Sequence, residues 1–381
     1  MVRRNLLFTA VFAGALFAGA IPSAKPEDAG MSSERLARIG DSIRRHVEAG
    51  DISGAVTMVS RRGRITHFEA HGLMDIESKK PMASNAIFRM ASMSKPVTGV
   101  AILMLIEEGK IRPSDPVSKF IPEFKDMKVV VAKEGRPAQP GQTVPEPQFY
   151  LAPANREITI RDLLTHTSGL VSGGIGARQA AKLAPRGPND TLADYIPRLA
   201  GVPLDFQPGT QWAYSGLAAF DTLGRVVEVV SGLAYDQFLK QRIFDPLGMK
   251  DTGFWQPEEK LARRVTLYRR TPQGLMKAEN QNLLASAKYF SGAGGLMSTA
   301  EDYLQFAQML VNGGVLNGKR LLSPRTVEWM ASNHVGDMFN GKAGRPAHGM
   351  GFGLSVCVIE DAVAAGLRLS NGSFGWDGAF G

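Results

Sequence analysis

The chain has 381 residues, of which 44% are hydrophobic and 21% are charged, and its formal net charge is +8. These values are ordinary for a globular protein, and the length suffices for one large domain or two smaller ones. The basic residues form scattered pairs such as Arg61-Arg62 and Arg263-Arg264 instead of one stripe, which argues against nucleic-acid binding.

The cysteine and histidine content excludes further classes of site. Cys357 is the only cysteine of the sequence, so no internal disulfide can form. The sequence holds no cysteine cluster, no HExxH motif and no histidines at metal-ligand spacing. We therefore expect neither a metal site nor a cofactor.

The first 20 residues, "MVRRNLLFTAVFAGALFAGA", differ from the rest of the chain. Arg3 and Arg4 precede an apolar run that ends in Ala18-Gly19-Ala20, a pattern typical of a secretory signal peptide cleaved near Ala20. A membrane anchor is the alternative, but the apolar run is short for a bilayer span, and no cysteine follows it that could carry a lipid. We expect a periplasmic or secreted protein with no membrane span after cleavage. The sequence does not indicate its oligomeric state.

The segment after the signal predicts a helix and a hairpin. "MSSERLARIGDSIRRHVEAG" is amphipathic, is capped by Ser32 or Ser33 and stops at Gly50, and its apolar face consists of Leu36, Ile39, Ile43 and Val47. "GAVTMVS" and "RITHFEAHG" then predict two strands joined by the tight turn Arg61-Arg62-Gly63.

The stretch "IFRMASMSKPVTGVAILMLIEEG" predicts a short strand that runs directly into a helix. Ser92 and Lys95 stand at the mouth of this helix, and Pro96 occupies its first turn, where a missing N–H costs little. The helix is apolar nearly all round, so we expect it to be buried. A buried helix holds its first turn rigidly, as a catalytic geometry requires.

The middle of the chain, from Lys110 to about Ser291, is predicted to be mostly helical. Thr159 and Asp162 form a capping pattern at the start of "TIRDLLTH", and "LAAFDTLGRVVEVVSG" and "LAYDQFLKQRIFDPLG" predict two further helices that end at glycine. Residues 133–157 interrupt this pattern. They are rich in proline and glycine and predict an irregular surface insertion.

The C-terminal part predicts one more helix and then strands. In "STAEDYLQFAQMLVNGG" we expect Ser298 and Glu301 to form the capping box, and "GFGLSVCVIE" and "GSFGWDGAFG" resemble strands. Strands near both ends with helices between them favour an α/β (α+β) fold, in which helices flank an antiparallel sheet. We expect a discontinuous α/β domain formed by residues 27–89 and 291–381, with a mostly helical domain of residues 90–290 inserted into it.

Ser92 and Lys95 also suggest chemistry. Positions i and i+3 share one face of a helix, so the amine can reach the hydroxyl and take its proton, provided that the lysine pKa falls. A helix N-terminus favours an oxyanion there. However, a chain of this length contains about one Ser-x-x-Lys by accident. Ser92 as a helix cap and Lys95 as a solvated side chain therefore remain an alternative.

The wider context resembles a known superfamily. "FRMASMSKPVTGVAILMLIEEGKI" is similar to the active-site segment of the serine β-lactamase-like hydrolases, which include class C β-lactamases, DD-peptidases and β-lactamase-like carboxylesterases. "ITIRDLLTHTSGL", "PGTQWAYS", "GAGGLMSTAEDYLQF" and "GSFGWDGAFG" follow in the order of that family. The resemblance covers about residues 27–381 and is closest to the carboxylesterase branch, the family VIII esterases.

The resemblance implies roles for residues of the first two motifs. Ser92 matches the nucleophile, Lys95 the lysine beside it, and Tyr214 the phenol that accepts and donates protons with the lysine. We treat lysine and tyrosine as a coupled pair and assign the base to neither alone. Gly216 stands where the family has an asparagine that binds the substrate amide, which disfavours lactams more than esters.

The third motif of the family, Lys-Thr-Gly, becomes Trp376-Asp377-Gly378 here and is expected to bind substrate. The missing lysine and the acidic neighbour point away from penicillins, which carry a carboxylate. The resemblance also implies an oxyanion hole formed by the backbone N–H groups of Ser92 and Ala379. We interpret His166, in "HTSGL", as structural because the family uses lysine and tyrosine.

These expectations together predict a serine hydrolase that acts through an acyl-enzyme on Ser92, with a small-molecule ester or lactam as substrate. A carboxylesterase for short-chain esters is favoured, a β-lactamase or DD-peptidase is the alternative, and a non-catalytic binding protein on the same scaffold is an alternative of another class. Family members normally continue beyond the position of Gly381. We therefore expect a fragment, and the alternatives are a partner chain that supplies the missing strands or a degenerate protein that no longer folds.

Overall fold

The computed structural model describes residues 20–133, 148–278 and 288–380. The signal peptide predicted for residues 1–20 therefore lies almost wholly outside the described residues, and so does most of the insertion predicted for residues 133–157. Within the described ranges, no helix has the length and apolar character needed to cross a membrane.

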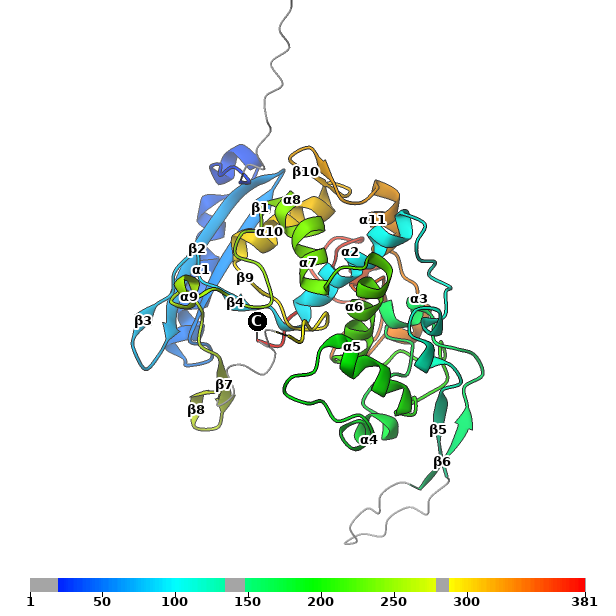
Figure 1. Cartoon of the computed structure of the whole chain (residues 1–381). Helices are drawn as coiled ribbons and strands as arrows, with labels where there is room; N and C mark the ends of the chain where they lie inside the picture. The colour runs from blue at the N-terminus through cyan, green and yellow to red at the C-terminus, as the bar shows by residue number, and fades with distance from the viewer. Residues whose placement is uncertain (1–19, 134–147, 279–287, 381) are drawn as a thin grey trace, which may run out of the picture.

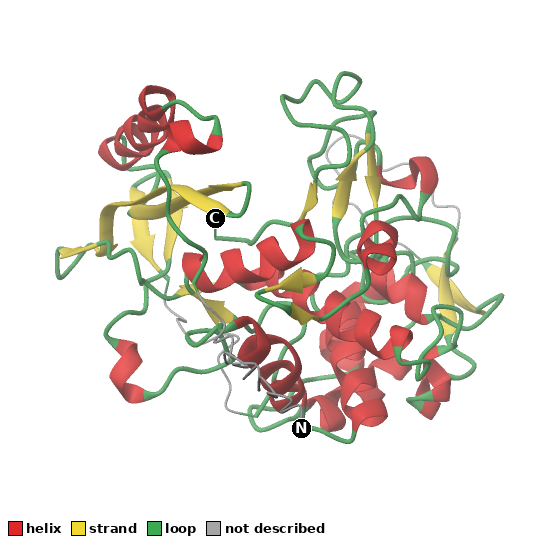
Figure 2. Cartoon of the chain, turned by 90° about the horizontal axis from the view of Figure 1, so that it is seen from above, coloured by secondary structure: helices red, strands yellow, loops and turns green. Residues whose placement is uncertain are grey.

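The N-terminal part forms a small antiparallel sheet with one helix against it (Figures 1 and 2). The sheet has the order β1-β2-β3, and its strands are β1 (Gly54–Arg61), β2 (Arg64–Asp75) and β3 (Lys80–Pro81). Helix α1 (Ser33–Glu48) packs on it and is capped by Ser32, which accepts the backbone N–H of Arg35. In the hairpin turn, Arg62 and Gly63 have φ of 52° and 69°, as a type I′ turn requires. The predicted helix and hairpin are therefore confirmed.

Helix α2 (Ser94–Glu107) lies between this sheet and the helical half of the molecule (Figure 1). All its residues from Ser94 to Leu105 are buried, as its apolar sequence predicted. Strand β4 (Phe88–Arg89), which pairs with β9 (Met297–Ser298), and a single 3-10 turn (Ala91–Met93) lead into it. Each fully buried leucine or isoleucine of α2 contributes about 1.5–3 kcal/mol.

The helical half follows α2 in the chain. Its helices are α3 (Ile160–Leu164), α4 (Ile175–Leu183), α5 (Leu192–Tyr195), α6 (Ala218–Ser231), α7 (Tyr235–Leu239) and α8 (Asp245–Leu247). Helix α9 (Glu258–Leu261) comes next in the chain and lies on the side of the N-terminal sheet, where Lys80 of β3 donates to the Ala262 carbonyl (Figure 1). Helix α6 packs against α2 and ends, as predicted, at Gly232, whose φ of 73° suits glycine. The helix expected after it is divided, because a π-helical turn (Lys240–Phe244) separates α7 from α8.

Two further strand pairs project from the molecule, one from the helical half and one on the side of the N-terminal sheet, where Tyr268 bonds Glu77 (Figure 1). They are β5 (Lys128–Ala132) with β6 (Phe149–Pro153), and β7 (Tyr268–Thr271) with β8 (Gly274–Lys277). Strand β6 lies inside the segment predicted to be irregular, so that part of the prediction is wrong. The run Phe149-Tyr150-Leu151 favours a strand, and pairing with β5 outweighs the surrounding prolines.

The C-terminal part adds helices and a second small sheet. Its elements are α10 (Ala300–Val311), β10 (Val315–Leu316), β11 (Lys319–Arg320), α11 (Pro324–Met330), β12 (Met350–Phe352), β13 (Cys357–Ile359) and β14 (Phe374–Gly375). The cap of α10 differs from the prediction. Thr299, and not Ser298, accepts the backbone N–H of Asp302, because the Ser298 side chain bonds Thr252.

Strands β12, β13 and β14 pair with one another and form a separate sheet from β1–β3 in the described ranges. A hydrophobic cluster beneath them includes Trp212, Phe339 and Phe352, with Tyr214 and Trp376 at its edge. The C-terminal strands therefore pack on the helical half. The predicted fold class, helices with antiparallel sheet, is confirmed by this architecture, and the division into two domains stays a prediction.

Position 99 tests how tightly α2 is packed. A Cβ at Gly99 would lie 2.1 Å from Ser355 Oγ and 2.8 Å from Ser355 Cβ. We expect Gly99→Val to lower the free energy of unfolding by about 1–3 kcal/mol, because buried atoms must shift. Urea denaturation followed by circular dichroism measures it. Gly201→Val is the control, since a Cβ there meets nothing within 4 Å. Equal losses in both variants would contradict the packing described for α2.

Candidate active site

Ser92 and Lys95 lie in contact at the start of α2. Lys95 Nζ is 3.2 Å from Ser92 Oγ, and Lys95 is fully buried, at 0% exposure, whereas Ser92 is half-buried. The residue at the cap of α2 is Met93, without a side-chain cap. The alternative that Ser92 is a helix cap and Lys95 a solvated side chain is therefore wrong.

Two backbone carbonyls fix the lysine amine. Lys95 Nζ donates to the carbonyl oxygens of Gly216, at 2.8 Å, and Ala293, at 2.9 Å. A neutral amine has two N–H groups and one lone pair. With both N–H groups donated to carbonyls, the lone pair is left for Ser92 Oγ. Burial lowers the pKa of Lys95, although Tyr214 and Asp221 oppose that shift, and a lowered pKa favours the neutral amine.

Tyr214 completes the group from a distant part of the chain. Its Oη donates to Ser92 Oγ at 2.7 Å, and Lys95 Nζ lies 4.9 Å from the centre of its ring. Trp376 Nε1 in turn donates to Tyr214 Oη at 3.3 Å. The structure thus brings Ser92, Lys95, Tyr214 and Trp376 together, while their catalytic and binding roles stay predictions.

The backbone before Ser92 is strained. Ala91 has a φ of 44°, in the left-handed region that costs an L-residue about 1–2 kcal/mol. This conformation turns the chain sharply from β4 into α2. Such strain is retained where the surrounding structure fixes it, and it often accompanies functional sites.

The third motif contains a contact that the sequence did not predict. Arg345 pairs with Asp377, and its guanidinium lies 5.6 Å from the centre of the Trp376 ring. The charge of Asp377 is therefore offset, which weakens the repulsion of carboxylates expected from this residue. Gly378 and Ala379 follow Asp377 in the chain. The substrate-binding role of Trp376-Asp377-Gly378 and the oxyanion hole of Ser92 and Ala379 stay predictions.

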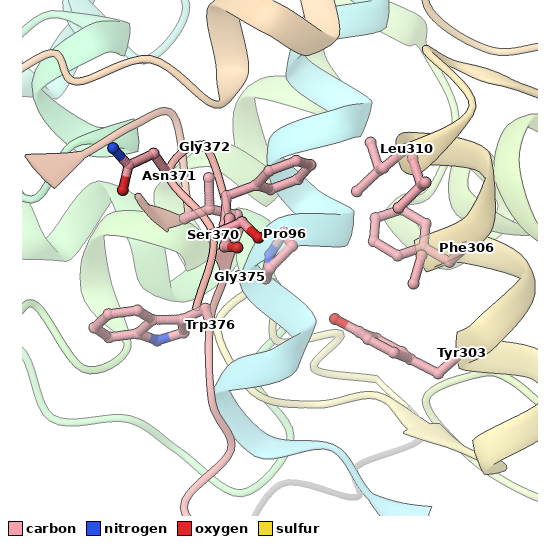
Figure 3. Close-up of a pocket in the computed structure, with 14 residues that line it drawn as sticks. Pro96, Tyr303, Phe306, Leu310, Ser370, Asn371, Gly372, Gly375 and Trp376 are labelled. Atoms are coloured by element: carbon pink, nitrogen blue, oxygen red, sulfur yellow. The ribbon is translucent and has the colours of Figure 1, made fainter. Parts of the chain in front are cut away.

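A cavity of about 580 Å³ borders the site (Figure 3). In Figure 3, Tyr303, Phe306 and Leu310 of α10 face Pro96 and Gly375 across it. Pro96 follows Lys95 in the chain, and Trp376, which also lines the cavity, contacts Tyr214. The cavity therefore adjoins the group around Ser92 on the side of β14.

A buried carboxylate supports the lysine from behind. Asp221 of α6 accepts Ser291 Oγ at 2.7 Å, the backbone N–H of Ala293 at 3.0 Å and Tyr289 Oη at 2.7 Å. Asp221 thereby fixes the position of Ala293, whose carbonyl accepts the hydrogen bond from Lys95. Burial raises the pKa of Asp221, against its hydrogen bonds and Lys95. Sequence reasoning missed this residue, although an aspartate in the apolar helix "LAAFDTLG" was an available signal.

His166, interpreted as structural, lies behind Tyr214 with the ring centres 4.7 Å apart. It is fully buried, and burial together with the charge of Lys95 lowers its pKa well below the ordinary value. In the described parts of the chain, no three His, Cys, Asp or Glu side chains gather so that they could hold a metal ion.

The chain is similar to a known protein family and to several of its relatives. The sequence profile of the Beta-lactamase family matches residues 39–381. The protein Rv1367c of Mycobacterium tuberculosis is 35% identical, over 89% of this chain and 84% of its own. The esterase EstB of Burkholderia gladioli is 29% identical, over 94% and 88%. The lovastatin esterase of Penicillium rubens is 30% identical, over 76% and 71%.

Solved structures agree with the sequence matches. The structure of EstCE1, described as a hydrolase with promiscuous acyltransferase activity, superposes with a TM-score of 0.73 at 28% identity, over 91% of this chain and 89% of that one. Simvastatin synthase from Aspergillus terreus has a TM-score of 0.72 over 91% and 88% of the two chains. Its identity is 22%, so this similarity concerns the fold alone.

Substitution of Asp221 tests its support of the lysine loop. We expect Asp221→Asn to lower the free energy of unfolding by about 1–3 kcal/mol, because an amide NH2 replaces one of the two oxygens that accept buried donors. Urea denaturation measures this change. The control is Asp245→Asn, whose exposed carboxylate pairs with Lys240 and which should change stability by less than about 1 kcal/mol. An unchanged stability of Asp221→Asn would show that the carboxylate does not hold the loop.

Proposed function

Because the chain belongs to the β-lactamase family, we propose that it is a serine hydrolase that cleaves short-chain carboxylic esters through an acyl-enzyme on Ser92. The observation that carries the proposal is the convergence of Ser92 Oγ, Lys95 Nζ and Tyr214 Oη. The similarity to EstB and to the lovastatin esterase supports the choice of an ester.

Acylation begins when Ser92 Oγ attacks the ester carbonyl carbon and its proton passes to the Lys95–Tyr214 pair. The tetrahedral intermediate collapses with loss of the alcohol, whose oxygen receives that proton from the pair. A water molecule then attacks the acyl-enzyme, gives a proton to the same pair, and the carboxylic acid leaves as Ser92 Oγ takes the proton back. The pair thus acts first as base and then as acid in each half of the reaction.

The developing negative charge requires donors. In this proposal the backbone N–H groups of Ser92 and Ala379 provide them. Removing one such donor typically costs about 2.7–4 kcal/mol of the barrier reduction, so the pair accounts for a large share of the catalysis.

Two features of the site support an ester over a lactam. Gly216 has no side chain to bind a substrate amide, and the space where its Cβ would be is open, with no atom within 4 Å. Its carbonyl is already engaged by Lys95. Trp376 stands where the family has a lysine. Arg345 instead favours a substrate with a carboxylate, such as a penicillin, because its guanidinium adjoins Trp376 and can replace the charge of the missing lysine. A β-lactamase is therefore kept as the competing outcome of the assay.

We expect the protein to hydrolyse p-nitrophenyl butyrate with a higher kcat/KM than a chromogenic cephalosporin. Ser92→Ala should lower ester turnover by about 10³-fold or more and abolish labelling by a fluorophosphonate, because the nucleophile is removed. Ser78→Ala, at an exposed serine, is the matched control. Faster cephalosporin turnover would favour a β-lactamase, and a protein that does not label would favour the non-catalytic alternative.

The pH dependence follows from the lysine. Since Lys95 must be neutral to take up the proton of Ser92, kcat/KM should rise with pH as Lys95 loses its proton. The midpoint should lie below the ordinary lysine value of 10.5, because burial lowers the pKa of Lys95. Stopped-flow or steady-state ester assays across pH measure it. Lys119→Arg, at an exposed lysine, should keep the profile, and Lys95→Arg should lose activity. Activity that falls as the pH rises would contradict this assignment.

A further inference from the structure

We propose that His166 is a positioning residue that holds Tyr214 against Ser92, through the hydrogen bond that its Nδ1 accepts from the backbone N–H of Ser215. The inference rests on the proposed function, since it concerns the orientation of the phenol that shares the proton with Lys95. It goes beyond the interpretation of His166 as structural, which gave the residue no part in orienting the site.

His166 accepts hydrogen bonds from the backbone N–H groups of the two residues that flank Tyr214 in the chain. The backbone N–H of Ala213 donates to the His166 carbonyl at 3.1 Å, and the N–H of Ser215 donates to His166 Nδ1 at 3.2 Å. The imidazole also lies against the Tyr214 ring, 4.7 Å between centres. One residue therefore fixes the backbone before Tyr214, the backbone after it and one face of the phenol ring.

The turn that carries His166 is itself held firmly. Ser215 Oγ donates to the Leu170 carbonyl at 2.7 Å, and the N–H of Gly209 donates to the Thr167 carbonyl at 2.8 Å. Thr167 Oγ1 donates to Asp162, which pairs with Arg156. The turn thus runs alongside residues 205–215 with repeated hydrogen bonds. It provides a fixed support for the Tyr214 segment.

The backbone of His166 adopts a conformation that is uncommon for residues other than glycine. Its φ is 57°, in the left-handed region, where a non-glycine residue costs about 1 kcal/mol or more. Glycine would adopt this conformation more readily. The presence of an imidazole at this position is explained if its side chain is needed for the bond to Ser215.

The surroundings select the tautomer that can accept this bond. The ring is enclosed by the side chains of Trp212, Tyr214, Phe220, Phe352 and Trp376. Of the titratable side chains near the His166 ring, Lys95 is the charged one, and the Tyr214 phenol is the other. In the described residues, Nε2 is buried without a hydrogen-bond partner. Because Nδ1 faces a donor, the proton of the neutral ring belongs on Nε2.

Two substitutions separate the hydrogen bond from the volume of the ring. His166→Phe keeps an aromatic ring of similar size and removes the acceptor. His166→Asn removes most of the ring and can present Oδ1 near the position of Nδ1. Asparagine also adopts a φ of 57° more readily than phenylalanine does, so His166→Gly, which suits this backbone but has no acceptor, is the third variant. Only a residue that holds Ser215 is replaced better by asparagine than by both phenylalanine and glycine. His46→Asn, at an exposed histidine on α1, is the control.

The readout is kcat for p-nitrophenyl butyrate per serine titrated with the fluorophosphonate, so that unfolded molecules do not count. We expect His166→Phe to lower kcat about tenfold, with KM within about threefold of the wild type, as loss of one buried hydrogen bond predicts. His166→Asn should recover kcat to within about threefold of the wild type. A His166→Phe variant with unchanged kcat, or an asparagine variant no better than the phenylalanine or the glycine variant, would overturn the proposal.

A second measurement does not depend on turnover or on the folding of a variant. ¹⁵N-histidine NMR of the wild-type protein at neutral pH should show His166 protonated at Nε2 and unprotonated at Nδ1. A ring protonated at Nδ1 would overturn the proposal even in an active enzyme. If the wild type neither labels nor hydrolyses esters, the proposed function fails, while the Nε2–H tautomer would still support the bond to Ser215.

Discussion

The burial of the Lys95 amine is the constraint on which the rest of the site depends. A charged amine in a protein interior costs several kcal/mol, so the group needs partners or must lose its proton. The carbonyls of Gly216 and Ala293 accept its N–H groups. Both carbonyls belong to loops at the end of α2 where Ser92 lies. The fold must therefore close these loops over the start of α2 before the lysine can be neutral.

The polar groups of the site form two layers. Ser92, Tyr214 and Trp376 are half-buried and face the space where a substrate can enter. Lys95, His166 and Asp221 are fully buried behind them. Lys95 contacts Ser92, and His166 contacts Tyr214 and the peptide after it. Asp221 binds the backbone N–H of Ala293, whose carbonyl accepts Lys95. The three inner residues are polar groups buried at a cost in free energy. Because their hydrogen bonds hold them in place, they fix the geometry of the three outer residues.

Local features of the fold could be predicted from the sequence, and contacts between distant segments could not. The helix from Ser33 and the turn at Arg62-Gly63 follow from local spacing and turn chemistry. The predicted cap of α10 is wrong by one residue because Ser298/Glu301 and Thr299/Asp302 fit the same spacing, and only the contact of Ser298 with Thr252 separates them. The family resemblance identified Ser92, Lys95 and Tyr214. The roles of Asp221 and Arg345 in the site could not be predicted, because their partners lie far from them in the chain.

The hydroxyl of Ser92 touches the side chains of Lys95, at the start of α2, and of Tyr214. Trp376, directly after strand β14, donates to Tyr214 in turn. The environment of this serine is therefore a property of the assembled tertiary structure and not of a local motif. A fluorophosphonate added during refolding would label Ser92 only after the segments that hold Lys95, Tyr214 and Trp376 have packed together. Labelling of the proposed nucleophile would therefore report the assembly of the whole site and not the formation of α2 alone.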